Sequence, residues 1–146
     1  QRLYFPLNES TLFMINKNFR ELTRDKKKEI KKITTKGRVF IIDNFYDGVL
    51  RFKFIDLCDK NLGAEDYINI SNISDHIFIE GIPKFNDDNS NQQLRFITLI
   101  DILYEKKITL SLSLENDLNN LGSSKKHLQT FKRTTSRLIE LTQKIR

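Results

Sequence analysis

Two arginines near the end of the sequence, Arg133 and Arg137, have a spacing that could do chemistry. They lie four residues apart in the segment FKRTTSRLIEL, so on a helix they share one face. Like charges in that position repel by about 0.2–0.5 kcal/mol, which favours an anion between them. Arginine binds phosphate through paired hydrogen bonds, and a helix beginning at Thr134 would add its free amides. The pair therefore predicts a phosphate contact.

A carboxylate of the same chain is the alternative partner for these arginines. Glu140 lies three residues after Arg137 and four before Lys144, so both cations could pair with it on a solvated helix face. The residues alone leave both interpretations open.

The other reactive side chains predict no active site in this chain. Cys58 is the single cysteine and follows an apolar run, which is typical of a core thiol. His76 and His127 have no carboxylates at metal-ligand spacing, and His76 is expected to begin a strand. Asp101 and Glu105 lie one turn apart on a predicted helix, where carboxylates are usually on the surface. None of the five glycines belongs to a GxxxxGK[ST] phosphate loop.

The elements that must position the arginines follow from the apolar pattern of the 146 residues, which is one domain's worth of chain. A first helix is expected to be capped by Asn8 or Ser10 and to end near Arg24. Its apolar residues recur at helical spacing, namely Leu12, Ile15, Phe19 and Leu22. A second helix is predicted over residues 92–106, and a last one contains the two arginines.

Strand patterns complete the predicted fold. Residues 38–42 and 49–54 read as a hairpin around Asp47-Gly48, because that dipeptide is typical of tight hairpin turns. Residues 76–113 read as strand, helix and strand, the βαβ pattern of a parallel pair. A short helix follows Gly63, with Asp66 expected to cap it and Tyr67 to pack. The predicted class is mixed α/β: a small mixed sheet with helices packed on it.

Positive charge is concentrated at both ends of the chain. Residues 17–38 hold ten Lys/Arg against three Asp/Glu, and residues 125–146 hold seven against one, around an acidic middle. Residues 24–37 contain a basic patch and are expected to be a mobile linker or a helix extension; the patch is Lys26, Lys27, Lys28, Lys31 and Lys32. One interpretation of this charge is an anionic partner, which would be nucleic acid, a nucleotide phosphate or a membrane surface; the other is a solvated surface.

Nucleic acid is the less favoured partner. Five phenylalanines recur at core periodicity and are not interleaved with Lys/Arg on an exposed strand, as base stacking would require: Phe13, Phe19, Phe52, Phe54 and Phe96. No apolar run reaches the eighteen residues of a transmembrane segment, and one cysteine excludes a disulfide framework. An intracellular, cytoplasmic chain is expected.

A succession of motifs in the chain resembles a known family. In order they are FKFIDLC at 52–58, LGAEDY at 62–67, GIP at 81–83, RFITLIDILYE at 95–105 and FKRTTSRL at 131–138. Their order and spacing resemble the C-terminal region of the ZapE-type and AFG-like (lactation-elevated) P-loop ATPases. The resemblance covers roughly residues 3–141.

The resemblance implies a domain that acts within a longer protein. Members are AAA+ ATPases, so residues 1–146 would be a C-terminal, lid-type regulatory domain whose ATP and Mg²⁺ are held by an upstream ATPase core. The implied roles of the full-length protein are cell division with an FtsZ-like protein, or quality control of inner-membrane proteins, with a peripheral place at that membrane. Within AAA+ logic, Arg133 or Arg137 would sense the γ-phosphate, and Arg95 would be a second anion contact. A stand-alone basic binding module or a protein-interaction scaffold is the alternative.

Overall fold

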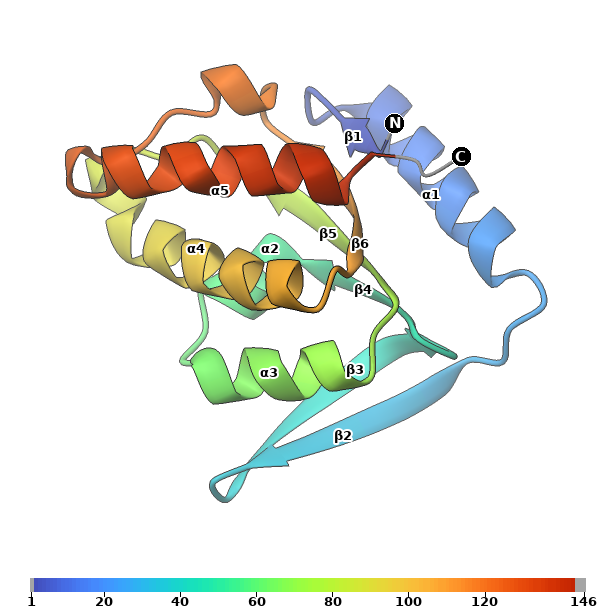
Figure 1. The fold of residues 1–146 in the computed structure, drawn as a ribbon. Helices are drawn as coiled ribbons and strands as arrows, with labels where there is room; N and C mark the ends of the chain where they lie inside the picture. Colours follow the sequence, from blue (N-terminus) through green and yellow to red (C-terminus); the bar gives the residue numbers. More distant parts are fainter. Residues whose placement is uncertain (1, 144–146) are drawn as a thin grey trace.

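A six-stranded mixed sheet with helices on both faces forms the domain (Figure 1). The structure is a computed structural model and describes residues 2–143. Along the chain the strands and α-helices are β1 (Leu3–Tyr4), α1 (Glu9–Thr23), β2 (Glu29–Thr35), β3 (Arg38–Tyr46), β4 (Val49–Lys53), α2 (Phe54–Cys58), α3 (Ala64–Asn72), β5 (His76–Ile82), α4 (Ser90–Glu105), β6 (Thr109–Leu114) and α5 (Leu128–Leu141). Single 3₁₀ turns cover Asp87–Asn89, Leu118–Asn120 and Lys125–His127. The predicted mixed α/β class is confirmed.

The helices are divided unequally between the two faces of the sheet. α3, α4 and α5 lie on one face, and α1 lies on the other (Figure 1). The larger core fills the first face, where the rings of Phe54, Phe85 and Phe96 meet with centroids 5.7–5.8 Å apart. The smaller core lies under α1, where Phe19 meets Phe78 edge to face at 5.1 Å.

One half of the sheet is parallel and the other is antiparallel. The strand order is β1-β6-β5-β4-β3-β2, with parallel pairing from β1 to β4. The predicted βαβ unit over 76–113 is confirmed, because β5 and β6 pair in parallel around α4. β1 escaped prediction, since two residues are too few to show a period.

The predicted hairpin around Asp47-Gly48 is confirmed by β3 and β4. Asp47 and Gly48 have φ of 48° and 89°, and two successive positive φ angles match the twist of a two-residue hairpin loop. The Gly48 carbonyl accepts hydrogen bonds from the amides of Asp75 and His76 at 2.7 and 3.1 Å. A side chain at Gly48 would place its Cβ 2.3 Å from the Asp75 carboxylate. The turn thus requires glycine and fixes the start of β5.

The expectation of a mobile linker or helix extension over residues 24–37 is wrong for residues 29–35. They form β2, which pairs with β3 through a second tight turn at Lys36-Gly37, with φ of 48° and 78°. The side chains of Lys31, Ile33 and Thr35 point to the covered face, so the strand does alternate. The alternation was hidden because a partly covered lysine occupies an inward position.

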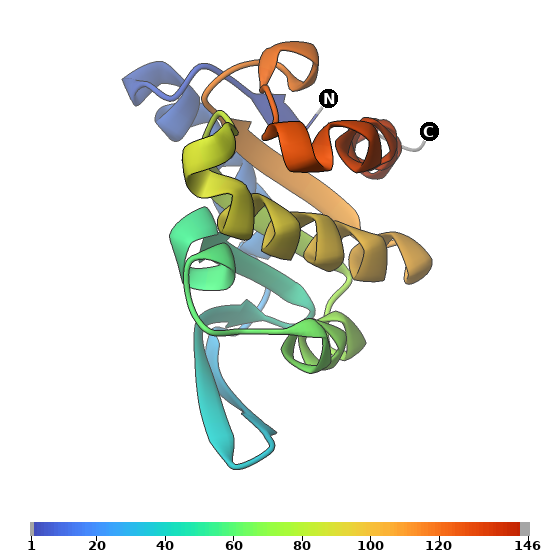
Figure 2. The ribbon, with the colours of Figure 1, turned by 90° about the vertical axis from the view of Figure 1, so that its left-hand side faces the viewer.

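The β2–β3 hairpin is tied to the body of the domain by α3. In Figure 2 it extends well beyond the rest of the sheet. Arg38 Nη2 lies 2.9 Å from a buried carboxylate oxygen of Asp66, which also accepts the amide hydrogen of Gly63 at 2.9 Å. Burial alone would raise the pKa of Asp66, but the Gly63 and Arg38 hydrogen bonds lower it below 3.8. The predicted capping role of Asp66 is confirmed.

Helix α1 begins and ends close to prediction, but only part of its apolar stripe is buried. Asn8 caps it through a capping box with Thr11, and the helix ends at Thr23. Ile15 is buried between α1 and the sheet, whereas Leu12 remains 50% exposed. The first turn of α1 extends beyond the sheet, so Leu12 lines a crevice and is not packed in the core.

Candidate functional site

Helix α5 carries the two arginines in its interior. It begins at Leu128, directly after the 3₁₀ turn, and its buried stripe runs from Phe131 through Thr134 to Leu138. A helix beginning at Thr134 is therefore wrong: Thr134 is fully buried in mid-helix, because the apolar stripe continues upstream of it. Amides inside a helix bond the carbonyl one turn back, so none is free to bind an anion beside the arginines.

The anion between the two arginines is Asp101 of α4. Arg137 Nη1 lies 2.5 Å from Asp101 Oδ1, and Arg133 Nη2 lies 3.8 Å from Oδ2. Each arginine therefore faces a different oxygen of one carboxylate, which relieves their repulsion. The side chain of Asp101 is 36% exposed, so the expected surface position is only partly correct.

Tyr104 completes this arginine–carboxylate cluster, which we define as Asp101, Tyr104, Arg133 and Arg137. The Arg137 guanidinium carbon lies 4.6 Å from the centre of the Tyr104 ring, a distance typical of cation–π contacts. All four residues come from α4 and α5, which lie side by side in Figure 1. The cluster is therefore a polar seam between the last two helices.

The alternative pairing of Arg137 with Glu140 is not formed within residues 2–143. Glu140 instead lies 3.9 Å from Lys107, at the end of α4. The expected partner Lys144 lies outside the described residues. An intramolecular carboxylate does neutralise the arginines, as one interpretation held, but it comes from another helix.

The two arginines differ in how tightly the cluster holds them. Arg137 is 24% exposed, with a short hydrogen bond to Asp101 and an aromatic ring beneath it. The side chain of Arg133 is 58% exposed. Its Nη2 lies 3.8 Å from Asp101 Oδ2, which is too far for a hydrogen bond. Arg137 thus anchors α5 to α4, whereas Arg133 exposes most of its side chain to solvent.

Arg95 belongs to a different contact. Its Nη1 donates to the carbonyl oxygen of Cys58 at the end of α2, at 3.2 Å. Asp101 faces α5, so the two residues bind elements on different sides of α4. The structure therefore does not bring the predicted second anion contact to Arg133 and Arg137.

Cys58 and Tyr67 are packing residues, as the sequence indicated. Both are fully buried, and the Tyr67 hydroxyl donates to the carbonyl oxygen of Leu57 at 2.6 Å. Burial raises the pKa of the Cys58 thiol to about 12 and also raises the pKa of Tyr67. A thiol held protonated in the core is a poor nucleophile.

We expect Cys58 to alkylate roughly a thousandfold more slowly in the folded chain than in the unfolded chain at pH 8, because so little thiolate forms at a pKa of about 12. The measurement is the rate of iodoacetamide incorporation by mass spectrometry, with and without urea. A folded rate within tenfold of the unfolded rate would contradict the buried placement.

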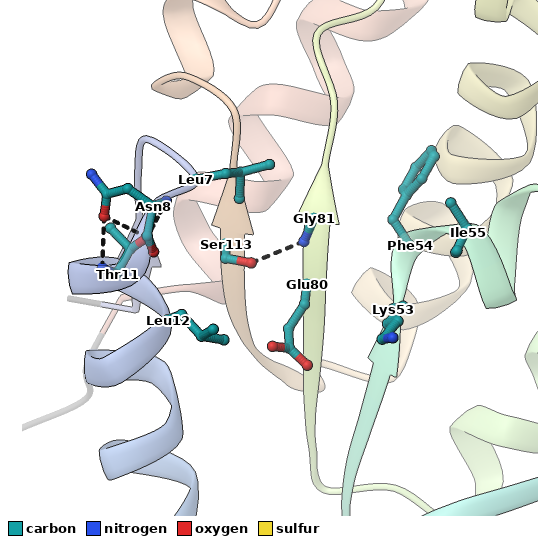
Figure 3. Close-up of a pocket in the computed structure, with 10 residues that line it drawn as sticks. All are labelled: Leu7, Asn8, Thr11, Leu12, Lys53, Phe54, Ile55, Glu80, Gly81 and Ser113. Atoms are coloured by element: carbon teal, nitrogen blue, oxygen red, sulfur yellow. Dashed lines mark hydrogen bonds between the residues drawn. The ribbon is translucent and has the colours of Figure 1, made fainter.

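A crevice of about 390 Å³ lies at the carboxyl ends of the parallel strands (Figure 3). Its floor includes Gly81 and Ser113, where the Gly81 amide donates to the Ser113 hydroxyl at 2.9 Å. Leu7 and Leu12 lie on one side and Ile55 on the other, all more than 40% exposed. Sequence reasoning missed this crevice, although the predicted βαβ unit was a usable signal, because ligands of α/β sheets often bind at this edge.

The predicted basic patch is divided by the fold. Lys26 lies 3.7 Å from Asp47, and Lys31 lies 3.8 Å from Glu29 and over the Phe45 ring. The other three lysines are exposed and make no ion pair with any described residue: Lys27, Lys28 and Lys32.

The aromatic pattern is also only partly as expected. Phe19, Phe52, Phe54 and Phe96 are buried, which removes them from base stacking, whereas Phe13 is 61% exposed and is not a core residue. None of the helices in residues 2–143 combines the length and apolar character needed to cross a membrane.

The strand–helix connections after β4 and β5 bear on nucleotide binding, because phosphate loops occupy such connections in α/β folds. β4 passes directly into α2 at Lys53-Phe54, without a loop that could cradle phosphates. The connection from β5 to α4 starts at Pro83 and carries no lysine-bearing glycine loop.

The fold is a mixed α/β domain, and its described residues contain no glycine-rich phosphate loop. The chain belongs to the AFG1-like ATPase family, whose model matches residues 1–145. The family resemblance expected from the sequence motifs is confirmed.

The curated relatives that this chain matches are much longer than the chain. It is 24% identical to the cell division protein ZapE of Escherichia coli K12 over 93% of this chain and 36% of the relative. It is 28% identical to lactation elevated protein 1 homolog B of Danio rerio over 61% of this chain and 18% of that protein. An uncharacterized Schizosaccharomyces pombe protein is 33% identical over 54% of the chain and 17% of its own length. The chain thus spans about a third or less of these relatives, and no solved structure matches it.

Proposed function

We propose that this chain is the C-terminal regulatory domain, in a lid-type role, of an AFG1-like ATPase and that it is not catalytic alone. The family match over residues 1–145 supports an ATPase parent. Residues 2–143 contain no glycine-rich phosphate loop, which supports a division of labour in which other residues of the longer protein build the nucleotide site. This domain would contribute a side chain that responds to the bound phosphate.

The observation that carries the proposal is the unequal hold of Asp101 on its two arginines. Arg137 is fixed at 2.5 Å, whereas Arg133 is 58% exposed at 3.8 Å. An exposed ion pair contributes at most about 1 kcal/mol, so Arg133 can leave Asp101 at low cost. A phosphate offers charge-assisted, bidentate hydrogen bonds in exchange.

Arg133 is therefore the proposed sensor, and Arg137 positions it. With Arg137 bound to Asp101, the middle of α5 stays fixed on α4 while the Arg133 side chain moves. When Arg133 leaves the Asp101 carboxylate and binds the γ-phosphate, the position of its side chain would depend on whether ATP is bound to the longer protein. Arg95, bonded to the Cys58 carbonyl, has no part in this exchange.

The test needs a longer protein in which this domain follows its nucleotide-binding core. There, Arg133→Ala is expected to lower the turnover number for ATP at least tenfold, because an arginine that stabilises a transferring phosphoryl group supplies at least that factor. The measurement is steady-state phosphate release at saturating ATP. Lys132→Ala, an exposed neighbour on α5, is the matched control and should change turnover less than twofold. Unchanged turnover in Arg133→Ala would exclude the sensor role.

The cellular setting of the parent is part of the same proposal. One relative is named a cell division protein, which supports a role in division with an FtsZ-like partner. Quality control of inner-membrane proteins, with a cytoplasmic or peripheral location at that membrane, is the other setting that the family implies. Cosedimentation of the chain with FtsZ polymers distinguishes the two, since only the first requires it.

A further inference from the structure

The β2–β3 hairpin leaves one strand edge open. β2 is the last strand of the sheet, and no strand within residues 2–143 pairs with its outer side. The backbone amides and carbonyls along that side can therefore accept another strand. Seven residues, Glu29–Thr35, give an edge long enough for a short extended peptide.

One face of the hairpin is uncovered as well. We define the outer hairpin face as five exposed residues on neighbouring positions of β2 and β3: Ile30, Lys32, Thr34, Val39 and Ile41. Ile30, Val39 and Ile41 are 65%, 59% and 52% exposed. Lys32 lies directly opposite Ile41, so a lysine stands within an apolar surface. α1 covers the same side of the sheet over its other half, where it packs on β1, β4, β5 and β6.

Lysines outnumber acidic residues along this edge. Lys28 directly precedes β2, and Lys32 lies in its middle; both are exposed and unpaired within the described chain. Glu29 lies beside Lys31, and Asp66 beside Arg38 at the other end of the hairpin. The exposed carboxylates of Asp25 and Asp43 form no ion pair with the described residues, so the lysine excess is only partly balanced. An approaching segment thus meets a net positive charge at the outer edge, next to exposed Ile30.

We propose that β2 is a docking edge for an extended, acidic segment of a partner polypeptide, which adds to the sheet as a further strand. Its backbone would pair with the free side of β2. Alternate side chains would fall on the outer hairpin face, where carboxylates meet Lys28 and Lys32 and apolar groups cover Ile30.

The lysines explain why the partner is acidic and is not a second copy of this chain. Lysines on a strand edge disfavour pairing of that edge with itself, because like charges would lie opposite each other. The same lysines favour a strand that carries glutamate or aspartate. This inference concerns β2 alone and does not depend on the ATPase proposal.

The experiment uses the intact chain and three fluorescent ten-residue peptides. The first alternates glutamate with valine and threonine. The second has the same charge, but two central residues are proline, which cannot pair as a strand. The third carries lysine in place of glutamate. Fluorescence polarisation is measured at low and high salt, and amide hydrogen exchange is followed at Ile30–Thr35.

The first peptide is expected to bind at least tenfold more tightly than the other two and to slow amide exchange along β2. The double change Lys28→Glu and Lys32→Glu should weaken its binding at least tenfold, whereas Lys126→Glu, an exposed lysine on the 3₁₀ turn before α5, should leave binding within twofold. Both sets of positions are exposed, so unchanged circular dichroism confirms that the variants fold.

Two results would overturn strand addition. One is equal binding of the acidic and proline-containing peptides, which would reduce the contact to charge alone. The other is binding of phosphatidylglycerol vesicles or single-stranded RNA that depends on Lys28 and Lys32, without binding of the acidic peptide. That outcome would assign the hairpin to a lipid or nucleic-acid surface.

Discussion

Asp101→Ala is expected to lower the free energy of unfolding by about 1–3 kcal/mol. The change removes the single carboxylate that lies between Arg137 and Arg133 and leaves Arg137, 24% exposed, without its hydrogen-bond partner. The repulsion between two arginines one turn apart on α5 is then no longer offset. Urea unfolding followed by circular dichroism measures the change at pH 7.

The two arginines provide the internal control for this prediction. Arg133→Ala should change the free energy of unfolding by less than about 0.5 kcal/mol, because its pair with Asp101 is exposed and loose. Arg137→Ala should approach the cost of Asp101→Ala, and the double variant should cost less than the sum of the two single changes. Equal effects of the two arginine variants would contradict the division into an anchor and a free side chain.

The sequence located the arginine pair and the kind of partner it required, but not the partner itself. A spacing of four on a helix is a local property, and it indicated correctly that an anion lies between Arg133 and Arg137. Asp101 is more than thirty residues away on another helix. Its contribution depends on how α4 packs against α5, which no local pattern encodes.

The same distinction separates the correct and incorrect predictions of the fold. α1, the β3–β4 hairpin and the βαβ unit were predicted because each has a strong period or a specific turn. β2 was missed because an inward lysine hides its period. The exposure of Leu12 could not be predicted, because a helical stripe does not show where the sheet beneath it ends. Edges of the fold are thus where the sequence was least informative.

His76, at the start of β5, is expected to make the stability of the domain depend on pH. Its Nε2 lies 2.8 Å from the Ser111 hydroxyl oxygen, and its ring stacks on Phe78 with centroids 4.8 Å apart. Burial, with a smaller contribution from the charge of Arg2, lowers the pKa of His76 to about 4. His76 lines a shallow cleft beside Arg2, and Glu21 of α1 lines this cleft as well. The folded chain therefore holds this imidazole neutral at a pH where an unfolded chain protonates it.

We expect this histidine to make the domain about 2–3 kcal/mol less stable at pH 4 than at pH 7. An unfolded histidine takes up its proton near pH 6.5 and the folded one only near pH 4, so stability is complete above pH 6.5 and is lost as the pH falls toward 4. The pKa of Asp66 is lowered in the folded chain, so the stability that Asp66 contributes is lost only below about pH 3.8. The pH ranges in which His76 and Asp66 destabilise the domain therefore do not overlap. Urea unfolding of the wild type and of His76→Gln at pH 7, 5.5 and 4 measures the difference. The variant keeps a polar group for Ser111 but cannot titrate, so its stability should change less over this range; parallel curves for the two proteins would contradict the buried, neutral imidazole.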